Sequence, residues 1–359
     1  MLLVPGPTEV SPRVLQTFRN PKLVHNDREA IELLDLTRSN LSKIFQTTNE
    51  VLVVPSSGRG GMESALTSIV EPGDDVLVIV NGLFGGWLEE IVARVGAHVT
   101  RLDFDWGTHV GLEEISELTS KRQFKVVTMV HGETSTGVAN RIDEVGKLVK
   151  DTEAVFIVDA VSTLGGMNLP TDDWNVDLCV TASQKCLGSV YGLTAISVSE
   201  KAWAKMAKRT SPCPSYTLDL YRWKELWVSK PYPKAYPVVV PPILSTALHE
   251  ATEEILEEGL EKRFLRHSTT AEFLRKGLER LGIELFAQRQ FASDTTTVFN
   301  VSDGLTDFKI LEHLKNHSMT IAPGMGKLRG KVLRVGHMAN VARVEYMTPL
   351  LTALEELPR

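Results

Sequence analysis

Short runs of apolar residues, rich in valine and isoleucine, recur along the first 240 or so residues and alternate with amphipathic stretches. The runs are continuously apolar, which is typical of strands buried on both faces of a mostly parallel sheet. The intervening stretches have helical patterns, and strands that alternate with helices indicate an α/β fold. The expected strands cover residues 51–55, 74–81, 124–131, 154–160, 176–182 and 193–199.

The pattern changes in the last third of the chain. Seven prolines lie between residues 212 and 242, and this density predicts an extended connector without regular helix or central strand. Residues 244–282 are strongly helical in pattern, with Gly282 as the expected C-cap. Strand–helix units follow and predict a smaller α+β domain. We expect an N-terminal arm (1–20), a large domain (21–242) and a small C-terminal domain (243–359).

The composition mainly argues against certain classes of protein. A chain of 359 residues exceeds one ordinary core, and its net charge of −6 disfavours nucleic acid as a partner. No apolar run approaches the roughly 20 residues of a membrane span, and the N-terminus does not have the pattern of a signal peptide. Cys179, Cys186 and Cys213 form neither a disulfide framework nor a CxxC metal motif. We therefore expect a cytoplasmic protein with no metal site and no membrane partner.

Three polar groups follow strands of the predicted sheet, where ligands of α/β proteins bind. Asp159 closes the strand "FIVD", Lys185 follows "VDLCVTA", and the hydroxyl-rich segment "HGETSTGV" follows "VVTMV". Burying an unpaired ammonium is costly, so Lys185 at the end of an apolar run indicates a use for its amine. Asp159 also suits a simple helix N-cap. Together, a carboxylate, hydroxyls and a lysine at neighbouring strand ends indicate a site.

This set suits pyridoxal phosphate. A lysine in a partly desolvated cleft has a lowered pKa and acts as an amine nucleophile toward an aldehyde. A carboxylate keeps the pyridine nitrogen protonated, so that the ring withdraws electrons. The segment "PSSGRGGMESA" combines a strand end, small residues and a helix N-terminus, which together favour a phosphate. Small-residue turns occur in many α/β proteins, so the prediction depends on the combination.

The sequence resembles the class V, fold-type-I pyridoxal-phosphate aminotransferases, most closely the alanine–glyoxylate and serine–pyruvate group. The resemblance covers essentially the whole chain in order. It implies a seven-stranded type of sheet in a large cofactor-binding domain, followed by the small domain. The matching segments are "PGPTEVSPRVL", "SSGRGGMESA", "NGLFGGW", "HGETSTGV", "VDAVSTLGGM", "SQKCLG", "ILEEGLEKRFLRH" and "LRVGHM".

The resemblance implies roles for individual residues. Lys185 would form a Schiff base with the cofactor and shuttle protons, and Asp159 would pair with the pyridine nitrogen. Arg334 would bind the substrate carboxylate, which suits a planar, permanently charged guanidinium. The other cofactor contacts would be Ser57, Gly58, Arg59 and Gln184 at the phosphate, Phe84 stacked on the ring, and Thr134 at the phenolic oxygen.

The resemblance also implies a homodimer with shared active sites, because Tyr236 matches a tyrosine that reaches the partner subunit's phosphate. The family's threonine three residues further on is Val239 here, so one phosphate contact is missing or replaced. Other readings stay open for three residues. Phe84 also suits the core, Arg59 a solvated position that offers only its amide, and Arg334 an ion pair across a domain surface.

The implied reaction is a ping-pong transfer of an amino group from alanine or serine to glyoxylate or pyruvate. A single clear substrate arginine disfavours an aspartate-type aminotransferase.

The rival within the family, pyridoxamine–pyruvate aminotransferase, has a glutamate where this chain has Ser57 and an arginine where it has Met325. A cysteine desulfurase-like enzyme would need a stacking histidine in place of Phe84 and a reactive loop cysteine such as Cys213. A non-catalytic relative would have lost Lys185, Asp159 or Arg334.

Overall fold

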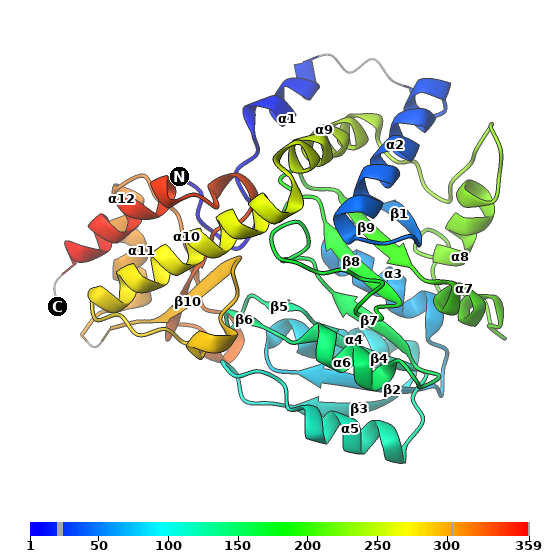
Figure 1. Cartoon of the computed structure of the whole chain (residues 1–359), viewed down its shortest axis with the longest axis horizontal. Helices are drawn as coiled ribbons and strands as arrows, with labels where there is room; N and C mark the ends of the chain where they lie inside the picture. The colour runs from blue at the N-terminus through cyan, green and yellow to red at the C-terminus, as the bar shows by residue number, and fades with distance from the viewer. Residues whose placement is uncertain (20–23, 303, 358–359) are drawn as a thin grey trace.

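The computed structural model describes residues 1–19, 24–302 and 304–357. A seven-stranded sheet forms the centre of the larger part of the molecule, in the order β1-β9-β8-β7-β4-β2-β3 (Figure 1). Its strands pair in parallel except at β9, which runs antiparallel to both β1 and β8. The predicted α/β class with a mostly parallel sheet is therefore confirmed. The strands are β1 (Glu50–Pro55), β2 (Asp75–Val80), β3 (His98–Asp103), β4 (Val126–Val130), β7 (Val155–Asp159), β8 (Leu178–Ala182) and β9 (Leu193–Val198).

The degree of burial explains which strands could be predicted from the hydrophobic pattern. Every residue of β4, β7, β8 and β9 is buried, as expected from their continuous apolar runs. Strand β3 was not among the expected strands, because it lies at the edge of the sheet and its exposed and half-buried residues break the apolar run. An edge strand faces solvent along one side, so polar residues are tolerated there.

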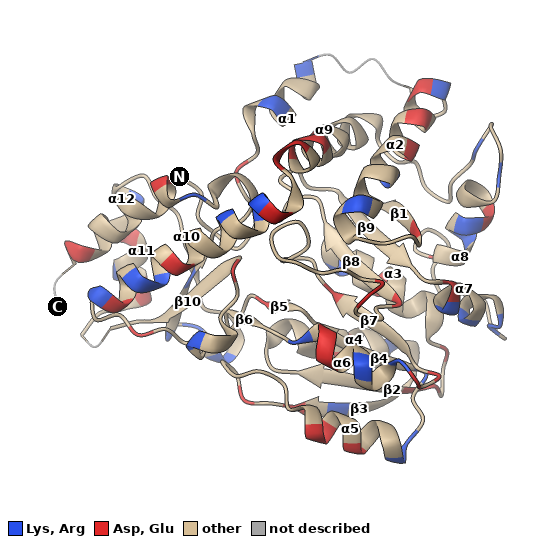
Figure 2. Ribbon diagram, viewed as in Figure 1, with Lys and Arg blue, Asp and Glu red and all other residues tan. Residues whose placement is uncertain are grey.

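Helices cover the sheet and follow its strands in the α/β manner (Figure 1). Most helices carry charged side chains of both signs, whereas the charged side chains of α9 (Pro242–Glu258) are all acidic (Figure 2). No helix in the described ranges is long and apolar enough to cross a membrane. The helices of this part are α2 (Arg28–Phe45), α3 (Gly58–Ile69), α4 (Leu83–Val95), α5 (Leu112–Lys121), α6 (Ile142–Val149) and α7 (Glu200–Ala207), and α1 (Pro12–Gln16) precedes them.

The proline-rich connector is not extended throughout, which corrects the expectation. Helix α8 (Leu220–Trp223) continues into a π-helical turn over Lys224–Val228. The seven prolines lie on either side of this segment, so none of them interrupts its backbone hydrogen bonds. Trp223 and Trp227 are buried here and anchor the connector to the large hydrophobic core.

The long helical stretch after the connector divides at Gly259. Helix α9 (Pro242–Glu258) packs on α2, and α10 (Leu260–Arg280) follows after a backbone φ of +82° at Gly259. Helix α10 ends at Arg280 with Leu281, not Gly282, as its C-cap residue. Gly282 follows with a φ of +68° and donates its N–H to the carbonyl of Glu279, so the helix stops one residue earlier than expected.

The C-terminal part has its own sheet and its own hydrophobic cluster (Figure 1). Leu3, near the N-terminus, is buried in this cluster, and its N–H donates to the carbonyl of Thr320. The expected domain boundary between residues 20 and 21 lies outside the described residues. The elements are β10 (Thr296–Asn300), β11 (Ala322–Pro323) and β12 (Val332–Gly336), with helices α11 (Asp307–Asn316) and α12 (Val344–Glu355).

Candidate active site

A cavity of about 340 Å³ lies where the carboxyl ends of β4, β7 and β8 meet the N-termini of α3 and α4. Its position agrees with the rule that ligands of α/β sheets bind beyond the carboxyl ends of the strands. Eight of the predicted site residues line this cavity, and they come from five separate parts of the chain. They are Ser57, Gly58, Arg59, Phe84, Thr134, Asp159, Gln184 and Lys185.

Burial shifts the two central ionisable groups toward their neutral forms. Burial, aided by the charge of Arg334, lowers the pKa of Lys185 to about 8. Burial raises the pKa of Asp159 to about 7, against the opposing effect of the Val161 N–H, which donates to Asp159 Oδ1 at 2.9 Å. Lys185 Nζ donates to the carbonyl of Pro5 in the N-terminal arm. Near neutral pH the site therefore holds an amine that loses its proton readily. It also holds a carboxyl group whose ionised form a positively charged partner would stabilise.

The N-terminus of α3 forms one wall of the cavity. Ser57 is the N-cap, and its hydroxyl oxygen accepts a hydrogen bond of 3.3 Å from the N–H of Gly60. A Cβ at Gly58 would lie 2.7 Å from Cγ2 of Val161, so only glycine allows this close approach between the helix and the turn after β7. Free N–H groups and the helix dipole make this wall attractive to an anion.

Two further residues complete this wall. Gln184 is buried, and among the described residues its side-chain oxygen Oε1 has no hydrogen-bond partner. A buried polar atom without a partner indicates a ligand or water that would satisfy it. The Arg59 guanidinium lies 3.8 Å from the centre of the Trp87 ring, in a cation–π contact. The Arg59 side chain is thus engaged by an aromatic ring, which leaves its backbone amide as the group nearest the helix end.

The N-terminus of α4 carries Phe84 and is capped by a buried carboxylate. Glu133 Oε2 accepts hydrogen bonds from the N–H groups of Phe84 at 2.9 Å and Gly85 at 3.1 Å. Glu133 Oε1 accepts from the N–H and the hydroxyl of Ser135. Burial raises the pKa of Glu133, which these hydrogen bonds oppose. Glu133 was not among the predicted site residues, because two of its hydrogen bonds come from a helix far away in the sequence.

Arg334 lies in the centre of β12 and is only 8% exposed. Its guanidinium donates to the carbonyl of Pro323 at 2.8 Å and approaches that of Thr134 at 3.4 Å. Burial lowers the pKa of Arg334 to about 10. Arg334 pairs with no carboxylate within the described ranges, so a surface ion pair does not describe it. It lies beside Thr134 but is not among the residues that line the cavity.

Tyr236 lies outside the cavity of its own chain. Its hydroxyl donates to the carbonyl of His25 at 2.9 Å, and its ring stacks on Trp227 with 5.5 Å between the centroids. The structure therefore separates Tyr236 from the other predicted site residues. Its predicted contact is with a partner subunit, and that contact stays a prediction.

Several residues that line the cavity were not predicted as site residues. Tyr191, which is 54% exposed, follows Lys185 in the same turn region, and Trp87 and Ile91 lie on α4. Met325 also lines the cavity, in the loop that the sequence analysis compared with the pyridoxamine enzyme. An aromatic residue in a Gly-rich turn could have signalled Tyr191, but apolar residues on α4 look like ordinary core positions.

The family model described as "Aminotransferase class-V" matches residues 6–326, which include the cavity and Lys185. The chain belongs to the class V aminotransferases. This confirms the resemblance stated above and the enzyme class.

Individual relatives of this aminotransferase align with nearly all of it. The chain is 40% identical to an uncharacterised aminotransferase of Methanocaldococcus jannaschii, over 99% of this chain and 93% of that protein. It is 32% identical to the alanine–glyoxylate aminotransferase of Drosophila melanogaster, covering 99% of this chain and 91% of the relative. The crystal structure of ureidoglycine–glyoxylate aminotransferase from Bacillus subtilis superimposes with a TM-score of 0.95 at 33% identity, covering 99% and 91% of the two chains.

Class V aminotransferases depend on pyridoxal phosphate, and the residues of this cavity fit that group. The N-terminus of α3 offers an anion site, and the unpartnered oxygen of Gln184 leaves room for a further polar contact. Lys185 would supply an amine for the aldehyde, and Asp159 would supply a carboxyl for the ring nitrogen. The predicted cofactor is therefore confirmed at the level of the family, and the roles of single residues remain predictions.

Proposed function

We propose that this aminotransferase moves an amino group from alanine or serine to glyoxylate or pyruvate by a ping-pong mechanism. The observation that carries the proposal is the small number of positively charged side chains near the cavity. Apart from Lys185, the only cation among the described lining residues is Arg59, which stacks on Trp87. Arg334 is a buried arginine beside the cavity with no carboxylate partner among the described residues, whereas buried Arg263 pairs with Glu258. Arg334 is enough for one substrate carboxylate. The names of the Drosophila and Bacillus relatives both include glyoxylate, which supports it as the acceptor.

The residues of this chain would divide the work as follows. Pyridoxal phosphate, when bound, supplies an electron sink for the carbanion at the substrate α-carbon. Lys185 would hold the cofactor through Nζ, and its amine would also take the proton from the substrate α-carbon. Asp159 would hold the proton on the ring nitrogen. Arg334 would orient the substrate carboxylate, since the N-terminus of α3 already serves the phosphate.

Two residues distinguish this proposal from a pyridoxamine–pyruvate aminotransferase. Ser57 caps α3 and leaves the helix N–H groups available for a phosphate, whereas a glutamate at this position would repel one. Met325 lines the cavity where the rival has an arginine. A free pyridoxamine substrate has no phosphate and would not use this helix end.

The test is a screen of half-reactions. The cofactor-loaded protein is mixed with alanine, serine, glycine, aspartate, glutamate or pyridoxamine, and the loss of the visible band of the bound cofactor is followed. We expect alanine or serine to react fastest, and glyoxylate or pyruvate to restore the band. Faster conversion by aspartate or glutamate would refute the small-substrate proposal, and faster conversion by pyridoxamine would favour the rival.

We further propose that the enzyme is a homodimer of the cytoplasm. Tyr236 contributes nothing to the cavity of its own chain, which supports a role at a neighbouring subunit's site. A groove of about 680 Å³ adjoins the cavity through Arg59, Trp87 and Ile91, and it offers a surface for a second chain beside the site. All three cysteines are free thiols, which suits a reducing compartment.

A further inference from the structure

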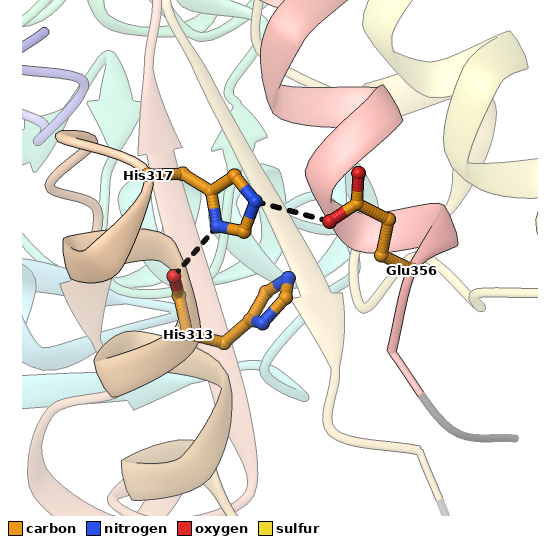
Figure 3. Close-up of side chains that lie close together, drawn as sticks. All are labelled: His313, His317 and Glu356. Carbon is orange, nitrogen blue, oxygen red and sulfur yellow. Dashed lines mark hydrogen bonds and ion pairs between the residues drawn. The ribbon is translucent and has the colours of Figure 1, made fainter.

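The C-terminal ends of α11 and α12 meet at a cluster of three side chains, far along the chain from the active-site lysine (Figure 3). His313 lies in the last turn of α11, and His317 is the C-cap residue of that helix. Glu356 is the C-cap residue of α12. Each residue offers one potential metal-ligating atom, and the three atoms lie within 4.8 Å of one another.

The hydrogen bonds of the two imidazoles decide where their lone pairs lie. A carbonyl oxygen only accepts, so His317 Nδ1 must carry the proton that it donates to the carbonyl of His313, at 3.0 Å. In the neutral form of His317, the lone pair is then on Nε2. This atom faces the carboxylate oxygen Oε2 of Glu356 at 3.0 Å, so two acceptors point at each other. Either a proton on Nε2 or a metal ion bound by both atoms resolves this arrangement.

His313 differs from His317 in which ring nitrogen has a backbone partner. Its Nε2 donates to the carbonyl of Ala353 at 2.8 Å, so the neutral ring keeps a lone pair on its other nitrogen. Metal-binding histidines usually donate their second ring N–H to a carbonyl or carboxylate, which fixes the tautomer and raises the basicity of the ligand nitrogen. His317 has such a partner in the backbone of α11. For His313, Nε2 is the nitrogen that faces the cluster (Figure 3), so it would exchange its hydrogen bond to Ala353 for the bound ion.

The position of the cluster also favours positive charge. The C-terminal end of a helix carries partial negative charge from its unpaired carbonyl groups. Two such ends, those of α11 and α12, converge on the three side chains (Figure 3). We propose that His313, His317 and Glu356 bind a divalent transition-metal ion of the Zn²⁺ type, with water completing the coordination.

The ligand set and its spacing select the class of ion. Two imidazole nitrogens and one carboxylate oxygen suit Zn²⁺ and its neighbours in the transition series better than Mg²⁺ or Ca²⁺, which prefer oxygen ligands. Ligand atoms at about 2.0–2.2 Å from a tetrahedral Zn²⁺ are about 3.3 Å apart. The 3.0 Å between His317 Nε2 and Glu356 Oε2 is close to this value. Because both side chains are partly exposed, at 38% and 53%, small rotations bring the set together.

A bound ion would join two helices that are distant in sequence, so its role is to stabilise the C-terminal part of the enzyme. An ion that binds the folded chain and not the unfolded one stabilises the fold by mass action. The site lies outside the residues that line the cavity, so transamination should not require it.

The test is a calorimetric titration of Zn²⁺ into the cofactor-loaded protein after treatment with a chelator. We expect one ion per chain, and a rise of Tm with Zn²⁺ concentration. His317→Ala and Glu356→Gln should weaken Zn²⁺ binding at least about tenfold, because losing even an outer partner of a ligand costs tenfold or more. His313→Ala combined with His317→Ala should abolish the rise of Tm.

The matched controls are Glu355→Gln, one residue before the site on the same helix, and His98→Ala on the exposed edge strand β3. Both should bind Zn²⁺ as the wild type does, and all variants should keep wild-type transamination rates and far-UV circular dichroism. Equal binding by the wild type and the double histidine variant would overturn the proposal. So would absence of binding by the wild type, which would leave His317 and Glu356 as a simple ion pair.

Discussion

Lys185 and Asp159 illustrate at the scale of single residues how one physical cause prepares two groups for different tasks. Asp159 is buried at the end of β7 and Lys185 is half-buried just after β8, and desolvation disfavours the charged form of each. For Lys185 this lowers the pKa and makes a better nucleophile. For Asp159 burial raises the pKa. A cationic partner, such as a protonated ring nitrogen, would therefore strongly stabilise the ionised carboxylate at this position.

The lowered pKa of Lys185 predicts the pH dependence of cofactor loading. Only the deprotonated amine attacks an aldehyde, so the rate should rise as the pH increases through about 8 and level off by about 9. The measurement is stopped-flow absorbance after mixing cofactor-free protein with pyridoxal phosphate. A rate that keeps rising through the ordinary pKa of a lysine, 10.5, would contradict the prediction.

At the scale of elements, the site depends on two helices whose first turns reach the cavity. Helix α3 presents free N–H groups, and α4 presents Phe84. Neither helix is positioned by its own sequence alone. The first turn of α4 is held by Glu133 from the segment after β4, and α3 packs against the turn after β7 through Gly58.

We predict that Glu133→Gln impairs the site through α4. The amide keeps one acceptor oxygen, whereas the carboxylate accepts four hydrogen bonds, two of them at the N–H groups of Phe84 and Gly85. The loss should cost about 1–3 kcal/mol of unfolding free energy and weaken the affinity for pyridoxal phosphate. Chemical denaturation and a fluorescence titration with the cofactor measure the two effects. Unchanged affinity together with unchanged stability would show that the cap does not position Phe84.

We predict that Gly58→Ala weakens cofactor binding by pushing α3 away from the turn after β7. The added methyl group would lie 2.7 Å from Val161 Cγ2, and overpacking of this kind costs about 1–3 kcal/mol. The matched control is Gly86→Ala on α4, where the nearest atom in its surroundings is the tip of Arg101 at 4.0 Å. That variant should bind the cofactor normally and be as stable as the wild type or slightly more so. Equal affinities of the two variants would argue against close packing at Gly58.

At the scale of the whole molecule, the two largest hydrophobic clusters of the described residues belong to different parts, with the cavity on the larger one and Arg334 on β12 of the three-stranded sheet. The N-terminal arm connects them, since Leu3 belongs to the smaller cluster and the carbonyl of Pro5 contacts Lys185. The proposed binding of substrate through Arg334 would therefore require that both parts hold their relative position.

The proposed homodimer is tested by complementation. A Tyr236→Phe variant should bind pyridoxal phosphate about 10-fold or more weakly, because a hydrogen bond to a charged group contributes about 1.5–3 kcal/mol. Lys185→Ala should be folded and inactive. In mixed dimers, one site combines Lys185 of the first variant with Tyr236 of the second, so its cofactor affinity should return to the wild-type value. Light scattering that shows an active monomer, or mixtures without recovery, would refute the shared site.

Much of the fold could be predicted because a continuous run of apolar residues indicates that the segment is buried. The strands β4, β7 and β8 were expected from continuous apolar runs, and these strands deliver Asp159 and Lys185 to one edge of the sheet. Strand β3 and helix α8 were missed, since an edge strand lacks an apolar run and the flanking prolines obscured a short helix.

The sequence by itself determined the class of fold, the strand ends that carry chemistry and, through the family resemblance, the cofactor. These follow from the order of residues, because burial and strand direction are expressed within short segments. Tertiary structure alone decided which distant groups meet. Glu133 caps a helix that begins fifty residues earlier, and His313, His317 and Glu356 come together only where two helices end. Such contacts depend on how the elements pack against one another, and no periodicity along the chain records that packing.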